Sequence, residues 1–129
     1  MPMALKNLTI LLVEDELDSS NELLYTLKPL FKKVIVATNG LEGKELFFQY
    51  LPDLILTDIR MPILDGLTMI EEIHKDFPNI PVIILTAYNE IPYLFKSMEL
   101  KIDDYILKPV NLQDLIEALK KAAYFINLV

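Results

Sequence analysis

The sequence predicts an α/β fold in which a doubly wound, five-stranded parallel sheet is covered by five helices. The first observation is a strict alternation of five short apolar runs with five longer amphipathic stretches. The second is that the runs are rich in Val, Ile and Leu with little polar alternation, which is typical of strands buried on both faces. The third is that 53% of the 129 residues are hydrophobic, enough for one substantial core. We expect a single domain over residues 1–129, with its core at about 8–123.

Each predicted strand is short and is followed by a stretch with helical spacing of apolar residues. The strands are expected at Leu8–Val13, Val34–Ala37, Leu54–Thr57, Val82–Leu85 and Tyr105–Leu107. Apolar residues three or four positions apart predict helices over 23–31, 41–47, 67–77, 91–98 and 112–123. The simplest doubly wound order for such strands is 2-1-3-4-5, which makes the first and third strands neighbours.

Several polar residues and prolines mark the expected helix ends. Asn111, three residues before Asp114, predicts a capped start for the last helix. Asn89 is a candidate cap for the fourth helix, with Pro92 in its first turn. Pro29 lies near the end of the first helical stretch and should end or kink that helix.

Composition excludes several classes of site and partner. The chain has no cysteine and one histidine, which excludes disulfide scaffolds, thiolate zinc sites, cysteine nucleophiles and multi-histidine metal sites. Its formal net charge of -7 makes it a poor candidate for direct nucleic-acid binding. No apolar run approaches the roughly 20 residues of a membrane span, and the N-terminus lacks the layout of a signal peptide. We therefore expect a soluble, cytoplasmic protein with no membrane partner.

Polar residues that can bind a ligand follow the first, third, fourth and fifth apolar runs. Glu14 and Asp15 follow the first run, Asp58 the third, Thr86 the fourth and Lys108 the fifth. The carboxyl ends of parallel strands share one edge of the sheet, where such folds bind ligands. With the first and third strands adjacent, three carboxylates come together and repel each other unless a cation intervenes. A hard, oxygen-preferring cation such as Mg²⁺ is the natural candidate, because the chain offers neither thiolates nor clustered histidines.

This set of residues points to phosphoryl transfer. Mg²⁺ usually binds one or two protein carboxylates and keeps positions for water or phosphate oxygens. A lysine and a hydroxyl at adjacent strand ends suit the remaining oxygens of a phosphoryl group, since such transfer depends mostly on positioning and charge neutralisation. Asp58 is the best candidate nucleophile, because it follows the middle strand of the sheet. Asp58, Thr86 and Lys108 are therefore the candidate catalytic residues.

Four short segments resemble the response-regulator receiver domain of two-component signalling. The most specific is 54–66, which reads LILTDIRMPILDG; the others are VEDE at 13–16, LTA at 85–87 and DYILKP at 104–109. They occur in the family's order at the ends of the predicted strands, and the resemblance extends over about residues 9–122. It implies a flavodoxin-like fold and a signalling domain that is no enzyme on other substrates and catalyses only its own phosphorylation and dephosphorylation.

The resemblance implies that Asp58 accepts a phosphoryl group from a phosphohistidine of a sensor histidine kinase or a phosphotransfer protein. It also implies a Mg²⁺ ion bound by Asp15, Asp58 and the backbone carbonyl of Arg60, with Glu14 contributing through water. Glutamate is a common variant at the first acidic position of the family, so metal binding is expected to survive.

The resemblance also assigns the partners of the phosphoryl group. Its oxygens would contact the Thr86 hydroxyl, the backbone N–H of Ala87 and Lys108, and the Lys108–Pro109 peptide bond would be cis. Tyr105 matches the switch aromatic, whose ring turns inward when Thr86 moves toward the phosphoryl group. The face formed by the fourth helix, fifth strand and fifth helix would then change shape and contact an output protein or domain, or a second copy of the chain.

Two other functions fit the same residues less well. A Mg²⁺-dependent phosphatase of the haloacid-dehalogenase type needs a second aspartate two residues after the nucleophile, where this chain has Arg60. A degenerate receiver, folded but not phosphorylated, would serve as a constitutive interaction module, although all the key residues are present.

Two further features have structural interpretations. His74 lies beside Lys75 and Asp76 on the third helical stretch and is expected to be a solvated surface residue rather than a phosphodonor. Asp65–Gly66 is typical of a turn in which the glycine adopts a positive φ.

Overall fold

Strands and helices alternate along the part of the chain that the structure describes. The structure is a computed structural model, and it describes residues 5–126 apart from the side chains of Tyr88, Leu94, Lys96, Ser97 and Phe125. The strands are β1 (Thr9–Val13), β2 (Lys33–Ala37), β3 (Leu54–Asp58), β4 (Val82–Thr86) and β5 (Asp104–Leu107). The α-helices are α1 (Leu17–Leu27), α2 (Gly40–Tyr50), α3 (Gly66–Asp76), α4 (Ile91–Lys96) and α5 (Leu112–Ile126). Short 3-10 turns are η1 (Leu5–Asn7), η2 (Tyr88–Glu90) and η3 (Ser97–Glu99).

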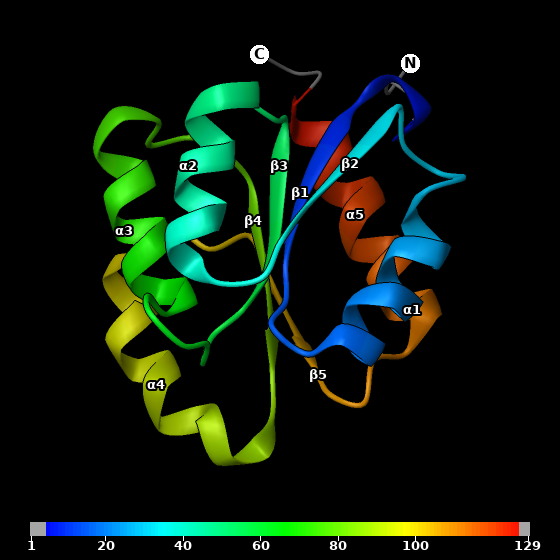
Figure 1. Ribbon diagram of the computed structural model, residues 1–129. Coiled ribbons are helices and arrows are strands. Elements are labelled where there is room, and N and C mark those ends of the chain that lie inside the picture. Colours follow the sequence, from blue (N-terminus) through cyan, green and yellow to red (C-terminus); the bar gives the residue numbers. More distant parts are fainter. Residues whose placement is uncertain (1–4, 127–129) are drawn as a thin grey trace.

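The five strands form one parallel sheet in the order β2-β1-β3-β4-β5, which confirms the predicted order. In Figure 1 the sheet is seen nearly edge-on, with α2 and α3 on one side and α1 and α5 on the other. This arrangement is the doubly wound, flavodoxin-like α/β fold. Its strands all run in one direction, so their carboxyl ends share the lower edge in Figure 1.

Alternate residues of the central strands face opposite layers of helices. Ile10 of β1 packs in the cluster that contains Leu27 of α1, whereas the adjacent Leu11 packs with Phe47 of α2 and Ile70 of α3. All five side chains are at most 1% exposed. Burying a large apolar side chain contributes roughly 1.5–3 kcal/mol, so both faces of the sheet stabilise the fold. This two-sided burial explains why the strands are continuous apolar runs in the sequence.

Local signals explain most helix ends. The C-cap of α1 is Lys28, directly before Pro29, as the proline predicts. The Asp114 N–H donates to Asn111 Oδ1 at 3.1 Å, which confirms the predicted cap of α5. Asn89 lies inside η2 rather than directly before α4, so the position next to that helix belongs to Glu90 and not to the predicted cap.

The fourth helical stretch is shorter than the sequence predicts. The helix expected over 91–98 is divided between α4, six residues long, and the 3-10 turn η3. The longest helix among the described residues is α5, with 15 residues. Within residues 5–126, no helix is both long and apolar enough to cross a membrane.

Candidate functional site

The sheet brings the predicted polar residues to one edge. Asp58 and Thr86 are the last residues of β3 and β4, and Glu14 and Lys108 directly follow β1 and β5. Because β1, β3, β4 and β5 are consecutive in the sheet, these side chains belong to neighbouring strand ends. Strands β3 and β4 are one residue longer than predicted, since Asp58 and Thr86 continue the hydrogen-bonded ladder.

Three carboxylates form the centre of the site. Glu14, Asp15 and Asp58 each offer one carboxylate oxygen, and these three atoms lie within 4.8 Å of one another. Glu14 is 1% exposed and Asp58 is 4% exposed, whereas Asp15 is exposed. Neither carboxylate oxygen of Glu14 has a hydrogen-bond partner among the residues that the structure describes. Buried carboxylates that accept no hydrogen bond need a positive charge beside them. These three carboxylate oxygens therefore fit a hard cation such as Mg²⁺.

Lys108 supplies part of that positive charge. Its Nζ lies 2.7 Å from Asp58 Oδ1 and 3.8 Å from Glu14 Oε1. The Lys108–Pro109 peptide bond is cis. One ammonium group faces three carboxylates, so the site retains an excess of negative charge that a divalent cation would balance.

The ionisation of Asp58 reflects competing environments. Burial is the largest influence and raises the pKa of this carboxyl above its ordinary value of 3.8. The hydrogen bond and charge of Lys108 act in the opposite direction, and the nearby charge of Glu90 raises the pKa further. Lys108 therefore favours the ionised carboxylate that a nucleophile requires.

Glu90 is a site residue that the sequence reasoning missed. The Ala87 N–H donates to Glu90 Oε1 at 2.8 Å, and the Arg60 N–H donates to Glu90 Oε2 at 3.3 Å. Glu90 is 8% exposed, so it is a buried acid rather than a solvated one. The sequence indicated a role for Glu90 only through its position, four residues after Thr86 and directly before the fourth helix. A glutamate in a first helical turn usually indicates only a favourable helix dipole interaction.

The remaining predicted residues lie on β4 and β5 and in the loop after β3. Thr86 is 3% exposed, and its hydroxyl donates to the Ala87 carbonyl at 3.3 Å. Arg60 follows β3 by two residues, and its guanidinium carbon lies 5.5 Å from the centroid of the Tyr93 ring on α4. Tyr105, on β5, is 39% exposed. The Arg60 side chain thus links the loop after β3 to α4.

The expectation of a positive φ at Gly66 is wrong. No glycine in the described chain has a positive φ, and Gly66 is the first residue of α3. Asp65 is the N-cap of this helix, and its carboxylate accepts hydrogen bonds from the Thr68 N–H and hydroxyl. Glycine is needed for space, because a Cβ at position 66 would overlap the backbone carbonyl of Asp58.

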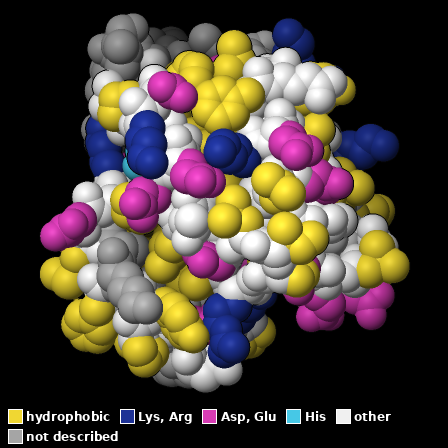
Figure 2. Space-filling view, turned by 60° about the vertical axis from the view of Figure 1, so that its left-hand side comes forward, with side chains coloured by type: hydrophobic (Ala, Val, Ile, Leu, Met, Phe, Trp, Pro, Cys, Tyr) yellow, Lys and Arg dark blue, Asp and Glu magenta, His cyan; other side chains and the backbone are white. Residues whose placement is uncertain are grey.

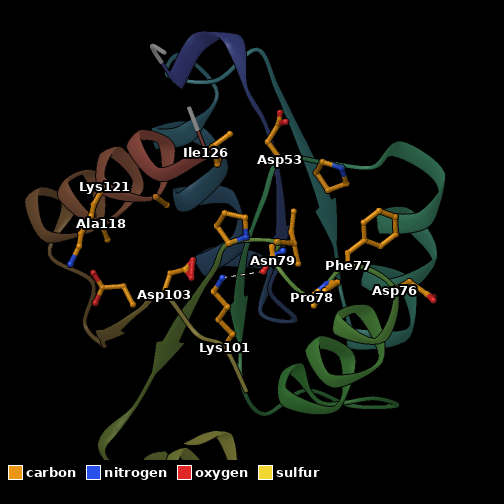
Figure 3. A pocket seen from close by; sticks show the side chains of 15 residues that line it. Asp53, Asp76, Phe77, Pro78, Asn79, Lys101, Asp103, Ala118, Lys121 and Ile126 are labelled. Atoms are coloured by element: carbon orange, nitrogen blue, oxygen red, sulfur yellow. Dashed lines mark hydrogen bonds between the residues drawn. The ribbon is translucent and has the colours of Figure 1, made fainter. Parts of the chain in front are cut away.

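A separate pocket of about 870 Å³ lies at the opposite edge of the sheet. Figure 3 shows side chains from the loops before β3, β4 and β5 around it, with Lys101 hydrogen-bonded to Asn79 at 3.2 Å. The lining includes Pro78, Asp103 and Ile126. None of the predicted site residues lines this pocket, so it is distinct from the acidic site.

His74, near this pocket, is not the solvated residue that we expected. Its Nε2 is buried and has no hydrogen-bond partner within the described chain. Burial lowers the pKa of His74 below 6.5, while a hydrogen bond to the Ile80 backbone and the charge of Asp103 raise it. The prediction relied on the polar neighbours of His74 in the sequence, Lys75 and Asp76. These two residues are exposed on α3, whereas the His74 side chain contacts the loop before β4.

Exposed apolar side chains gather on α4, η3, β5 and the start of α5. They are at least 39% exposed and comprise Ile91, Phe95, Met98, Tyr105, Leu107 and Leu112. Figure 2 shows hydrophobic side chains gathered on the lower part of the molecule, where α4 lies. An exposed apolar surface of this kind is typical of a protein interaction site.

Comparison with known proteins agrees with the fold and shows the family. The chain matches the family described as the response regulator receiver domain over residues 10–120. It is 37% identical over 106 residues to the probable transcriptional regulator ycf27 of Guillardia theta, covering 82% of this chain and 41% of that protein. It is 34% identical over 119 residues to the probable C4-dicarboxylate response regulator DctR of Priestia megaterium, covering 91% of this chain and 52% of that protein. The chain thus spans about half or less of these relatives.

Solved structures give the same answer. A response regulator receiver domain protein from Clostridium thermocellum is 29% identical, with a TM-score of 0.87 over 95% of this chain and 98% of that one. The N-terminal domain of an uncharacterized protein from Wolinella succinogenes is 36% identical, with a TM-score of 0.87 over 92% of this chain and 96% of that one. The family match over most of the chain and the similar solved structures therefore show that the chain belongs to the response regulator receiver domains of two-component signalling.

Proposed function

We propose that the chain is a phosphoacceptor domain that receives a phosphoryl group on Asp58. The observation that carries this proposal is the environment of that carboxylate at the end of β3. It is buried, it lies 2.7 Å from the Lys108 ammonium, and it belongs to a cluster with Glu14 and Asp15. A carboxylate surrounded by a cation and by further metal-binding oxygens suits nucleophilic attack on phosphorus.

Mg²⁺ is the cofactor that we propose for this site. Asp15, Asp58 and the backbone carbonyl of Arg60 would bind it, with Glu14 contributing through water. The buried Glu14 oxygens without hydrogen bonds and the three converging carboxylates support this assignment. When bound, the ion supplies positive charge against the carboxylates and the phosphoryl oxygens.

The proposed step is a displacement at phosphorus. A carboxylate oxygen of Asp58 forms a bond to phosphorus while the bond from phosphorus to the imidazole nitrogen of the donor histidine breaks. The imidazole keeps the electron pair, and Asp58 becomes an aspartyl phosphate. Lys108 neutralises charge on the transferred group, while the Thr86 hydroxyl and the Ala87 N–H donate to its oxygens. The same groups would assist hydrolysis, in which a water oxygen forms a bond to phosphorus while the bond from phosphorus to Asp58 breaks, releasing inorganic phosphate and the free carboxylate.

Phosphorylation would then alter the surface formed by α4, β5 and α5. We propose that Thr86 moves toward the phosphoryl group and that the half-exposed ring of Tyr105 turns inward behind it. The exposed apolar residues of this surface support a role in protein contacts. The proposed partners are a sensor histidine kinase or phosphotransfer protein, an output protein or domain, and a second copy of the chain.

The domain that we propose comprises residues 1–129, with its core at about 8–123. Residues 1–4 and 127–129 of this range lie outside the described residues. Because the chain covers only 41% of the ycf27 relative and 52% of the DctR relative, the output of the whole protein belongs to this proposal too. We propose the cytoplasm as its compartment.

Intact-mass measurement tests the phosphoacceptor function. The wild type is incubated with acetyl phosphate and Mg²⁺, beside an Asp58→Asn variant and a sample with excess chelator. We expect one added phosphoryl group on the wild type alone. The amide of the Asp58→Asn variant is no carboxylate nucleophile, and chelation leaves the three carboxylates without their counter-charge.

Three outcomes of this experiment would contradict the proposed function or part of it. A wild type that is folded, stays unmodified and also does not bind beryllofluoride would contradict the proposal and favour a constitutive interaction module. A phosphoryl group found on both the wild type and Asp58→Asn would assign the acceptor to another residue. Retained labelling in excess chelator would remove the metal from the proposal.

A further inference from the structure

Glu90 accepts hydrogen bonds from two backbone N–H groups of the site. Its two carboxylate oxygens accept from the N–H groups of Ala87 and Arg60, at 2.8 and 3.3 Å. These N–H groups belong to two different loops, one after β4 and the other after β3. A single buried side chain therefore ties the loop that follows Asp58 to the loop that follows Thr86.

One of these donors is needed for the proposed chemistry. The Ala87 N–H is the backbone group that would bind an oxygen of the phosphoryl group on Asp58. It has one hydrogen, and in this structure that hydrogen is directed at Glu90 Oε1. A carboxylate oxygen and a phosphoryl oxygen are both anionic acceptors, so they compete for the same position.

Electrostatics act in the same direction as this competition. The charge of Glu90 reaches Asp58, since it raises the pKa of that carboxyl. Glu90 is 8% exposed, so solvent screens its charge weakly. A phosphoryl group adds further negative charge at Asp58 and would be repelled by the Glu90 carboxylate.

We propose that Glu90 is a positioning residue that holds the Ala87 N–H in the unphosphorylated protein and is displaced by the phosphoryl group. This inference rests on the proposed phosphoacceptor function. Glu90 is the last residue of η2 and directly precedes α4. Its displacement would free the start of α4, and the loss of phosphate would allow the carboxylate to return to Ala87.

Beryllofluoride, which binds to an aspartate as a phosphoryl mimic, tests the competition without turnover. Its affinity is measured at saturating Mg²⁺ for the wild type, Glu90→Gln and the matched control Glu71→Gln. Glu71 is exposed on α3, so its replacement makes the same charge change away from the site. We expect Glu90→Gln to bind about tenfold more tightly, because its neutral amide oxygen accepts from the Ala87 N–H more weakly than a carboxylate oxygen and adds no negative charge near Asp58. Glu71→Gln should bind like the wild type.

The sign of the change separates competition from a merely structural role. If Glu90 only stabilised its loop, Glu90→Gln would bind beryllofluoride equally or more weakly, and that result would overturn the inference. A wild type that binds no beryllofluoride and takes no phosphoryl group would instead contradict the proposed function itself. Thermal unfolding of each variant monitors folding.

A second readout uses the wild type and does not depend on the stability of a variant. The carboxylate carbon resonance of Glu90 and the amide resonance of Ala87 are followed by NMR as beryllofluoride is added with Mg²⁺. Displacement predicts that both resonances shift together, because their hydrogen bond breaks. An unchanged Glu90 resonance in the saturated protein would overturn the inference.

Discussion

Ile63 carries a backbone conformation that is unfavourable for its side chain. Its φ is 71°, and the Leu64 N–H donates to the Pro62 carbonyl at 2.8 Å, so Ile63 is the middle residue of a γ-turn. A β-branched residue with positive φ is strained, because its Cβ crowds the backbone carbonyl. The turn is held in place by α2, since the Gly40 N–H donates to the Leu64 carbonyl at 2.9 Å.

Ile63→Gly should therefore stabilise the protein. Removing the Cβ relieves roughly 1–2 kcal/mol of strain, while the greater freedom of glycine in the unfolded chain costs roughly 0.5–1 kcal/mol. Ile63 is 75% exposed, so little packing is lost. We expect the free energy of unfolding in urea to rise by about 0.5–1 kcal/mol. Ile63→Ala, which keeps the Cβ, should gain less, and a glycine variant no more stable than wild type would contradict this explanation.

At the residue scale, the sequence predicted side chains whose position depends on a strand and missed those whose position depends on loop packing. Asp58 and Lys108 were found because the end of a buried strand fixes where they lie. Glu90 and His74 have ordinary polar neighbours in the sequence, and only the folded loops bring Glu90 to the N–H of Arg60 and place the His74 ring near Asp103. Such contacts join segments far apart in sequence, which a local pattern does not encode.

The start of α3 links the site to the helical layer. The Gly66 N–H donates to the Ile59 carbonyl at 2.7 Å, and Asp65 caps the helix, so the first turn of α3 is fixed against the end of β3. The missing Cβ of Gly66 leaves room for the Asp58 carbonyl. This close contact sets the position of the backbone that carries the proposed phosphoacceptor.

Gly66→Ala tests this contact against a matched substitution in α2. At Gly66 the added Cβ meets backbone of β3, which has little freedom to move, so we expect a loss of roughly 1–3 kcal/mol in the free energy of unfolding. At Gly43 the nearest atom is the flexible Met69 Sδ at 2.6 Å, and alanine is favoured inside a helix by roughly 1 kcal/mol. Gly43→Ala should thus be far less destabilising in urea denaturation. Equal losses in the two variants would contradict the proposed close contact.

At the element scale, the sequence predicted strands more accurately than helix ends. Two-sided burial produces continuous apolar runs, so each strand was found to within a residue. The fourth helix was less predictable, because its apolar spacing fits a longer helix than the chain forms. The helix begins where the spacing predicts, but residues 97 and 98 belong to the 3-10 turn η3, which the spacing of apolar residues does not distinguish from a further α-helical turn.

At the scale of the whole molecule, the two edges of the sheet differ in chemistry. The carboxyl edge carries the acidic site, whereas the loops before β4 and β5 bring His74, Lys101 and Asp103 close together. The strand order follows from strict alternation and could be predicted. The pocket at the second edge could not, because its shape depends on how the loops leave α3 and approach the strands.

The half-buried ring of His74 should give the whole protein a pH-dependent stability. Burial lowers its pKa in the folded state below the ordinary value of 6.5, so the unfolded chain binds more protons in the window just below that pH. The free energy of unfolding should therefore fall as the pH drops through 6.5 and level off below the folded-state pKa. Urea denaturation of the wild type and His74→Gln between about pH 8 and pH 5 isolates this contribution, because other groups such as Asp103 titrate in both proteins. The free energy of unfolding should fall more for the wild type than for His74→Gln as the pH falls. If the two free energies instead differ by the same amount at every pH, protonation of His74 does not contribute to the pH dependence of stability.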